Sequence, residues 1–401
     1  MRATRSREKA SSPSVLSRTD YMALSPEERA LYRPILSRYE RVPILCRIIY
    51  ALSALCAVLY ILQRTIPAFA DFFNLYVSSF FRAVLGLLTG WIPFSVAEGL
   101  LLLLPLILFV TIRYAVRYRC DTWRCVSVFV AILLSVLLSV GCLFVLNFSA
   151  GYYGSPLSDK MELDTSDIKD SELYDTAYYL VFHLNSLSRD IEYGSDGFSD
   201  MPYSVGEMNR HLNEAYSSLH EDHDFIPTFP SHAKPVLLSE GMSYLRTTGV
   251  YSFFTGEANI NVAFPDFTVP YTAAHELAHQ RGVAREDEAN FVAFLACLKS
   301  DDAYVSYCGF LNMFQYVASA VYQRDADSYR AIYRSLRPEI QGELAAYNDF
   351  ISKYEQSPVG DMSEAVNDAY LQSQGTPGTV SYNMVVKLAV GYHRALSDAG
   401  F

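Results

Sequence analysis

Three long apolar runs dominate the first third of the chain, at residues 42–62, 98–116 and 126–148. Each approaches or exceeds the roughly 20 residues that a helix needs to cross a lipid bilayer. Three such runs so close together are not typical of buried helices in a soluble core. The pattern therefore predicts a membrane domain with three transmembrane helices over residues 42–148, preceded by a polar tail at residues 1–41.

The segment between the first two runs is also apolar, but polar and small residues interrupt it. Residues 63–97 contain Asp71, Arg82, Gly86 and Gly90 within a stretch rich in Phe and Leu. We expect this segment to lie along the membrane surface as an amphipathic helix followed by a re-entrant turn. The alternative is a fourth transmembrane helix, which would invert the topology of everything that follows.

Residues 149–401 have the polar and apolar spacing of a water-exposed domain. Helical periods are expected at residues 171–187, 205–218, 285–299, 301–323, 325–336, 339–355 and 378–397. A strand-like segment, 249–264, precedes a short helix that Pro270 would begin and Gly282 would end. The predicted fold class is mainly α (α+β), with transmembrane helices followed by a mostly helical domain that contains a small sheet.

Charge separates the two parts of the chain and indicates their location. Residues 1–148 carry 16 Lys and Arg against 8 Asp and Glu, whereas residues 149–401 carry 16 against 35. Nine of the basic residues lie in residues 1–41, which favours a cytoplasmic N-terminus in an integral plasma membrane protein. With three spans, residues 149–401 become an extracytoplasmic domain. Its acidity argues against nucleic acid as a partner.

The most informative local motif is HELAH at residues 275–279. His275 and His279 are four residues apart, so one helical face carries both imidazoles. This spacing allows two His side chains to bind one Zn²⁺, and Glu276 then lies beside the coordination position at which a water is activated. The motif predicts metal-assisted hydrolysis of peptide bonds with Glu276 as the general base.

A catalytic zinc site needs a third protein ligand, and two sequence patterns point to the same residue. In the pattern HExxHxxGxxH, Gly282 matches the glycine, but Arg285 stands where the third His would be. The residue after it, Glu286, is able to bind a metal. The sequence EDEAN also fits a helix that supplies a Glu ligand from an E-x-x-A-D/N pattern. Glu286 is therefore the predicted ligand, with Glu288 as its main alternative.

Further residues are candidates only because of their type. Asn290 lies one helical turn beyond Glu286 and would suit a partner that orients a ligand His. Tyr382, His393 and Tyr271 are candidate donors to the oxyanion that forms during hydrolysis. The alternative for each of them is a structural role.

Residues 234–291, with the HELAH and EDEAN motifs, resemble domain of unknown function 3810, a bacterial family of membrane-bound HExxH proteins of the metallopeptidase type. The resemblance extends to the N-terminal spans and to IPFSVAEG at residues 92–99. It implies a zincin-type domain in which His275, Glu276 and His279 have their usual roles. It also implies a gluzincin-like helix with Glu286 as ligand, although Asn290 replaces the usual Asp.

The leading hypothesis is a membrane-anchored zinc metallopeptidase that binds the lipid bilayer and a peptide or protein substrate. Two other functions remain open. One is a non-catalytic membrane sensor or assembly protein with a structural or vestigial metal site, which would have four protein ligands. The other is a zinc amidase that acts on cell-wall peptides and uses the same residues.

Overall fold

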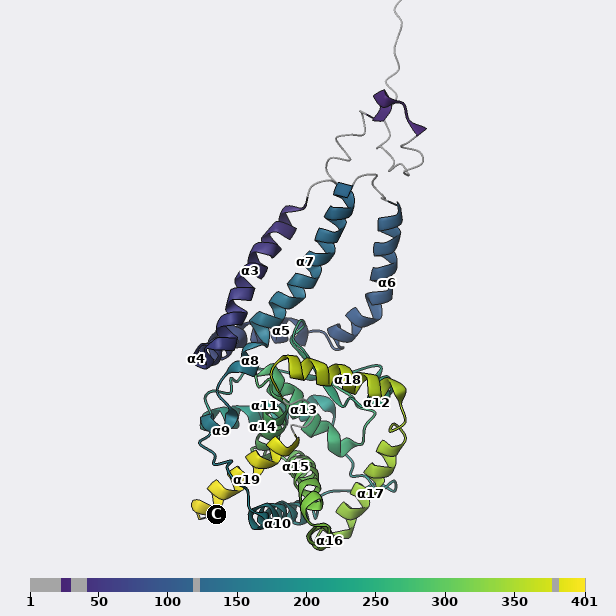
Figure 1. Cartoon of the computed structure of the whole chain (residues 1–401). Coiled ribbons are helices and arrows are strands. Elements are labelled where there is room, and N and C mark those ends of the chain that lie inside the picture. The colour runs from purple at the N-terminus through teal and green to yellow at the C-terminus, as the bar shows by residue number, and fades with distance from the viewer. Residues whose placement is uncertain (1–22, 30–41, 118–122, 377–381, 401) are drawn as a thin grey trace, which may run out of the picture. The chain divides into compact units, whose positions relative to one another are not determined.

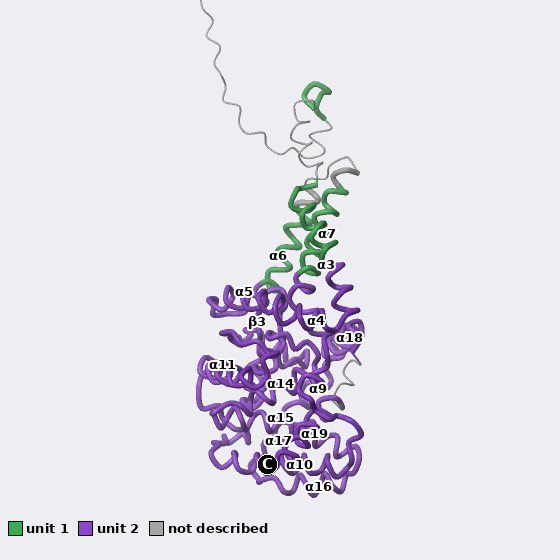
Figure 2. The backbone as a smooth tube through the Cα atoms, turned by 90° about the vertical axis from the view of Figure 1, so that its left-hand side faces the viewer, with its two compact units in different colours: residues 1–55, 100–142 green, residues 56–99, 143–401 purple. Residues whose placement is uncertain are grey.

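The computed structural model describes residues 23–29, 42–117, 123–376 and 382–400. The chain forms two compact units, which Figure 2 shows in different colours. Unit 1 comprises residues 1–55 and 100–142, and unit 2 comprises residues 56–99 and 143–401. Segments on both sides of the predicted membrane domain boundary therefore belong to unit 2.

Four apolar stretches in the described part of the chain are long enough to cross a membrane. They are α3 (Ile44–Thr65), the stretch Pro67–Gly90, α6 (Val96–Arg117) and α7 (Trp123–Asn147). The chain is thus a membrane protein, as its apolar pattern predicted. The second stretch is divided into α4 (Pro67–Phe72), the π-helix η1 (Phe73–Ser78) and α5 (Ser79–Gly90). The three-span topology stays a prediction.

Polar side chains hold α3 to α7 within unit 1. The Tyr50 hydroxyl donates to the carbonyl of Ala131 at 2.6 Å, and the Ser135 hydroxyl contacts Cys46 at 3.5 Å. Such contacts between helices replace the hydrogen bonds that hydrocarbon cannot provide.

Unit 2 is mostly helical and contains a small three-stranded sheet, which agrees with the predicted fold class. The strand order is β1-β3-β2. β1 (Ala233–Pro235) pairs in parallel with β3 (Glu257–Ile260), and β2 (Gly249–Ser252) pairs antiparallel with β3. The predicted strand-like segment 249–264 is therefore two strands. The turn between them contains Gly256 at φ +71°, a conformation that favours glycine.

Two consecutive helices, α13 (Val269–Gln280) and α14 (Glu286–Leu298), connect this sheet to the helical core. α13 packs against β2, β3 and α14, while α14 packs against α15 (Ala303–Arg324). The core is formed by apolar residues of these helices together with α10 (Asp170–Leu187), α11 (Val205–Asp222) and α19 (Tyr382–Asp398). Unit 2 therefore encloses the HELAH helix, which is almost entirely buried.

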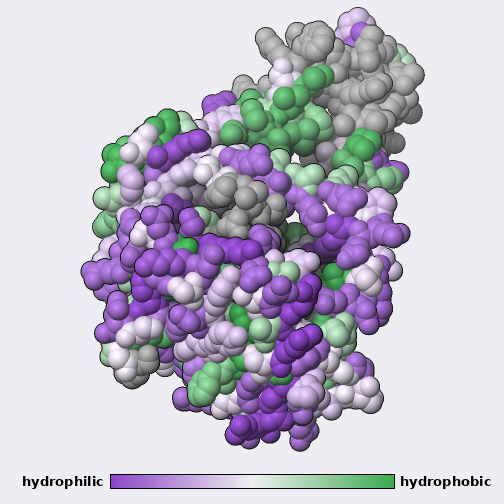
Figure 3. All heavy atoms as spheres, turned by 60° about the horizontal axis from the view of Figure 1, so that its bottom comes forward, coloured by the Kyte–Doolittle hydropathy of each residue, from purple (hydrophilic) through white to green (hydrophobic). Residues whose placement is uncertain are grey.

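The other helices of unit 2 surround this centre (Figure 1). They are α8 (Ala150–Tyr153), α9 (Leu157–Lys160), α10 (Asp170–Leu187), α11 (Val205–Asp222), α12 (Ser239–Tyr244), α16 (Ala326–Arg334), α17 (Pro338–Ser352), α18 (Pro358–Ser373) and α19 (Tyr382–Asp398). The helices predicted from the sequence correspond within a few residues to α10, α11, α13 to α17 and α19, whereas α8, α9, α12, α18 and β1 were not predicted. Figure 3, with the lower end of Figure 1 turned forward, shows a mainly hydrophilic surface.

The two ends of α13 are set by the residues that the sequence indicated. Pro270 lies in its first turn, and the chain leaves the helix through Gly282 at φ +96°. The Val283 N–H then donates to the Ala278 carbonyl, which closes the helix end. A Cβ at position 282 would lie 2.4 Å from Nη2 of Arg82, so the close approach also requires glycine.

A buried ion pair fixes the sheet to the start of α6. Lys234 of β1 and Glu257 of β3 lie 2.7 Å apart, and both are almost fully buried. The Glu257 carboxylate also accepts hydrogen bonds from the N–H groups of Val96 and Ala97. A negative charge at this position satisfies two N–H groups at the helix start and interacts favourably with the helix dipole.

Replacing Glu257 by Ala should destabilise unit 2 strongly, because it leaves the Lys234 charge buried without its partner. Breaking such a pair costs about 3–5 kcal/mol, which corresponds to roughly 6–20 °C in the melting temperature of a domain of this size. Thermal unfolding of the detergent-solubilised protein measures the change. The matched control is Glu364→Ala at an exposed pair with Arg246, which should leave the melting temperature nearly unchanged. Equal effects of the two substitutions would contradict the prediction.

Candidate metal centre

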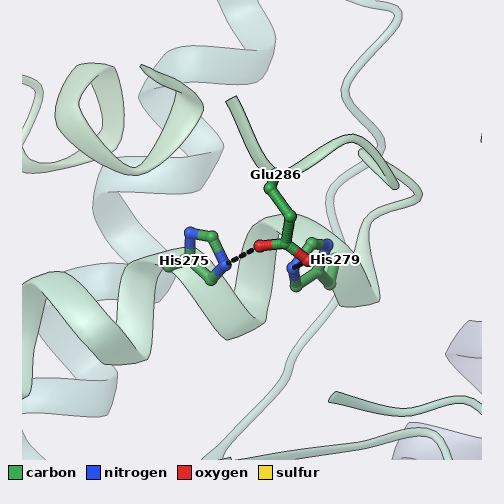
Figure 4. A group of neighbouring side chains, drawn as sticks. All are labelled: His275, His279 and Glu286. Carbon is green, nitrogen blue, oxygen red and sulfur yellow. Dashed lines mark ion pairs between the residues drawn. The ribbon is translucent and has the colours of Figure 1, made fainter. Parts of the chain in front are cut away.

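Three side chains from two helices converge next to the end of α13. His275 and His279 project from α13, and Glu286 is the first residue of α14 (Figure 4). The Glu286 carboxylate lies between the two rings, 3.2 Å from Nε2 of His275 and 3.6 Å from Nε2 of His279. The potential ligand atoms of the three residues all lie within 4.8 Å of one another. The structure therefore brings together the three residues predicted to bind a metal.

The turn after α13 orients the His279 ring. Its Nδ1 lies 2.7 Å from the carbonyl oxygen of Val283. When Nδ1 carries the proton and donates to this carbonyl, the lone pair of Nε2 points toward Glu286. Metal-binding His residues almost always donate their other ring N–H in this way. Gly282 causes this arrangement, because its left-handed conformation brings Val283 back over the last turn of the helix.

The two charges in the group stabilise one another. Burial by itself would lower the pKa of His279, but the Glu286 charge and hydrogen bond outweigh it and raise this pKa to about 9. Burial would raise the pKa of Glu286, but His279 and His275 lower it well below the ordinary range. Without a metal, the group is therefore an ionised carboxylate held between imidazoles, one of which is protonated near neutral pH.

Glu276 is buried in the same place, although its carboxylate points to different partners. Glu276 is only 4% exposed, and burial raises the pKa of its carboxylate to about 7. The Tyr251 N–H of β2 donates to this carboxylate, but its Oε2 atom has no hydrogen-bond partner among the described residues. A buried carboxylate oxygen without a partner is costly in a structure and is typical of a functional site.

β2 lies directly against Glu276 at a glycine. A Cβ on Gly249 would lie 2.5 Å from Oε1 of Glu276 and 2.8 Å from the methyl group of Thr272. Real Cβ atoms do not approach so closely, so the position of the Glu276 carboxylate depends on glycine here. The sequence predicts Gly249 only as the boundary of a strand.

The donor set fits a zinc ion better than it fits Mg²⁺ or Ca²⁺. Two imidazoles and one carboxylate, held by adjacent helices, are the ligand types of a catalytic zinc site with three protein ligands. Two imidazoles make Mg²⁺ and Ca²⁺ unsuitable, because both prefer oxygen ligands. The unpartnered Oε2 of Glu276 and the Val283 bond to His279 agree with this choice.

The alternative ligand Glu288 is engaged elsewhere. Its Oε1 accepts hydrogen bonds from the N–H of Leu157 at 2.8 Å and from Nη1 of Arg285 at 2.9 Å. Arg285, the residue at the third-His position of the longer pattern, also donates to the carbonyls of Tyr152 and Gly154. Glu288 and Arg285 therefore join α14 to the segment that follows α7, and Glu286 is left to face the imidazoles.

The other residues singled out from the sequence lie in varied places. Asn290 is half-buried on α14, and its carbonyl accepts a hydrogen bond from the Tyr271 hydroxyl at 2.9 Å, so Tyr271 has a structural partner. His393 lies on α19, where its ring contacts Thr176 and Tyr179 of α10, a helix that supplies no member of the His275 group. The Tyr382 side chain lies outside the described residues. The oxyanion role of His393 and Tyr382 remains a prediction without a supporting contact.

Aromatic residues that the sequence did not indicate lie near the group. The Phe148 ring lies edge-on to the His279 ring, with centroids 5.7 Å apart. The Tyr152 hydroxyl donates to that of Tyr370, on α18, at 3.2 Å. Burial raises the pKa of Tyr370 to about 12, and the Glu286 charge contributes to this rise. No pattern in the sequence indicates these contacts, because Phe148 and Tyr152 lie more than 120 residues before the HELAH motif and Tyr370 belongs to α18, which was not predicted.

No curated protein and no solved structure matches the chain. Residues 73–390, most of the chain, match the family described as Protein of unknown function (DUF3810), and the chain therefore belongs to that family.

Proposed function

We propose that this protein is a membrane-anchored zinc metallopeptidase in which His275, His279 and Glu286 bind the metal. The observation that carries the proposal is the convergence of these three side chains, with a buried and unpartnered carboxylate oxygen of Glu276 beside them. We further propose that the domain formed by residues 149–401 lies outside the cytoplasm, as the Lys and Arg distribution favours.

Each residue of the proposed site has a distinct role. A bound Zn²⁺ would supply a Lewis acid that polarises the scissile carbonyl and lowers the pKa of a coordinated water toward about 7. Glu276 accepts a proton from the attacking water and later delivers it to the leaving amine. A pKa of about 7 suits both halves of this transfer. The Tyr251 N–H and the close contact with Gly249 hold the carboxylate in position.

Tyr370 is the better-supported donor to the developing oxyanion. Its oxygen accepts a hydrogen bond from Tyr152, so its own proton is available to another acceptor. Tyr370→Phe should lower kcat by about 10²-fold, the lower end of the range for removal of one oxyanion donor, while zinc content stays unchanged. Steady-state kinetics with metal analysis measures both. His393→Phe is the matched control, and an equal loss of kcat in that variant would contradict the assignment.

Zinc affinity should increase with pH. Zn²⁺ competes with the proton on His279, whose pKa is about 9 in the metal-free protein. Below that pH, the affinity should rise by about tenfold for each pH unit, because one proton is displaced. Calorimetric titration in two buffers with different ionisation enthalpies should show release of about one proton at pH 7. A zinc affinity that does not change with pH would show that the His279–Glu286 pair is not the binding site.

The test of the proposed function uses the full-length protein in detergent, loaded with zinc and incubated with a diverse peptide library. Mass spectrometry should find new peptide termini that disappear after chelation and return when zinc is added back. Stoichiometric zinc without any cleavage, together with a fourth protein ligand in a metal-bound structure, would instead support a structural metal site. Digestion of purified peptidoglycan, in the absence of peptide cleavage, would support a cell-wall amidase.

A further inference from the structure

One end of each of three apolar helices belongs to unit 2 and is held there by hydrogen bonds. At the end of α3, the Gln63 side chain donates to the Val145 carbonyl and accepts from the Ser149 hydroxyl. At the start of α6, the Glu98 carboxylate accepts from the N–H groups of Leu237 and Leu238, at 2.9 and 2.8 Å. α7 ends at Asn147, whose carbonyl accepts from Arg82. These helices therefore have their unit 2 ends on the same side of a membrane.

The segment between α3 and α6 begins and ends on that side, so it does not cross the bilayer. Its inner face also packs on polar groups of unit 2. Arg82 of α5 is fully buried and donates to the carbonyls of Asn74, Asn147 and Arg281. The Gly86 position adjoins the Gln280 amide, where a Cβ would lie 3.1 Å from Nε2. If this helix crossed the bilayer, the polar groups on its buried face and the unit 2 groups that bind them would have to enter hydrocarbon, where no water can satisfy them.

The outer face of α5 is apolar and exposed. Ser78, Arg82 and Gly86, four residues apart, form the buried stripe. The opposite face carries large exposed apolar side chains: Phe80, Val84, Leu87, Leu88 and Trp91. Trp91, at the end of the helix, is 89% exposed. The exposed apolar face of α5 differs in this respect from the mainly hydrophilic face in Figure 3.

What covers this face follows from its connections in the chain. Five residues separate α5 from α6, and one residue separates α3 from α4, and both α3 and α6 are long enough to cross a membrane. An exposed apolar helix face joined so closely to two membrane helices lies next to lipid. Trp at the end of such a helix is typical of the headgroup region. A helix that is polar on one face and apolar on the other suits the bilayer surface.

The metal centre is adjacent to the same surface. Phe148, which contacts the His279 ring, is the first residue after α7. Arg82 and Asn74 of the α5 region bind the carbonyls of Arg281 and Gly282, immediately after the HELAH helix. The candidate metal site is therefore built on the end of a membrane helix and on the segment that faces lipid. A polypeptide held in the same membrane is closer to this site than one that diffuses freely in water.

We propose that the apolar face of α5 rests in the headgroup region of the bilayer and that the centre acts on polypeptides tethered to the same membrane. The second half of this inference rests on the proposed peptidase function. The first half depends only on the packing of α5 and is tested separately.

Tryptophan fluorescence locates α5, because the chain has only two Trp residues, Trp91 and Trp123. Trp123→Phe leaves Trp91 as the reporter in proteoliposomes of full-length protein. Lipids brominated near the headgroup should quench it more than lipids brominated near the ends of the acyl chains. Strongest quenching by the deep label would show that Trp91 lies in the hydrocarbon core and would overturn the headgroup position. Quenching by aqueous acrylamide alone would show that α5 does not touch lipid. Trp91→Phe, which retains Trp123 at the start of α7, is the control.

The substrate class is tested with one peptide library in two forms, free in solution and fused to a single transmembrane anchor. In proteoliposomes, the tethered form should be cleaved about a hundredfold faster, because tethering raises its effective concentration at the site. Equal rates would overturn the inference about tethering and leave the peptidase function intact. Cleavage of neither form by zinc-loaded protein would overturn the peptidase function, while the fluorescence result would still decide the position of α5.

Discussion

His275→Ala and His279→Ala should each reduce bound zinc from a stoichiometric amount to background. Loss of a group that only orients a ligand lowers metal affinity by about 10–100-fold, so loss of a ligand itself should lower the affinity further. The two remaining donors cannot compensate, because the group contains three potential ligands within reach of one another. Metal analysis of the purified protein after dialysis measures the loss.

Glu286 and Glu288 provide the sharpest comparison within this experiment. Both are Glu residues in the first turn of α14, two positions apart, but only Glu286 faces the imidazoles. Glu286→Gln should therefore weaken zinc binding strongly. Glu288→Gln should leave zinc binding intact and instead weaken the contact with Arg285 and Leu157, which thermal unfolding would detect. Zinc loss in the Glu288 variant alone would reverse the ligand assignment.

How far the sequence predicts this site depends on how local each contact is. The HELAH spacing, Pro270 and Gly282 predict the helix, its ends and the two imidazoles, because helical geometry relates neighbouring residues directly. Glu286 follows only seven residues after His279, so the choice of ligand was limited to one short segment. The carbonyl of Val283, which binds His279, is a consequence of the Gly282 turn that the sequence also indicated.

The contacts that sequence reasoning could not provide all depend on distant segments. Phe148 meets the His279 ring, and Tyr370 bonds to Tyr152, only because segments far apart in the sequence fold together, and apolar spacing carries no information about which helices meet. Arg82 illustrates the same limit. In the sequence it interrupts an apolar run, whereas in the structure it is fully buried and binds the carbonyls of Asn74, Asn147 and Arg281. The role of Arg82 can be recognised only from the packing of α5 against the rest of unit 2.

Glu276→Gln should retain zinc and lose turnover, because the amide keeps the shape of the side chain but cannot accept a proton. General acid and base groups contribute about 10²–10⁴-fold to rates, so kcat should fall by about this factor. Measuring kcat and bound zinc in one preparation separates catalysis from metal loss. Substantial activity in this variant would refute the role of Glu276 as general base.

Gly249→Ala tests the same role without changing Glu276. The new Cβ would lie 2.5 Å from Oε1, so the carboxylate has to move, while the three proposed metal ligands are untouched. Because a proton acceptor must lie within hydrogen-bond reach of the proton that it removes, we expect kcat to fall and zinc content to remain. The control is Gly342→Ala on α17, where a Cβ meets nothing within 4 Å, and it should leave kcat unchanged. Full activity of Gly249→Ala would show that the position of Glu276 against β2 does not matter for the reaction.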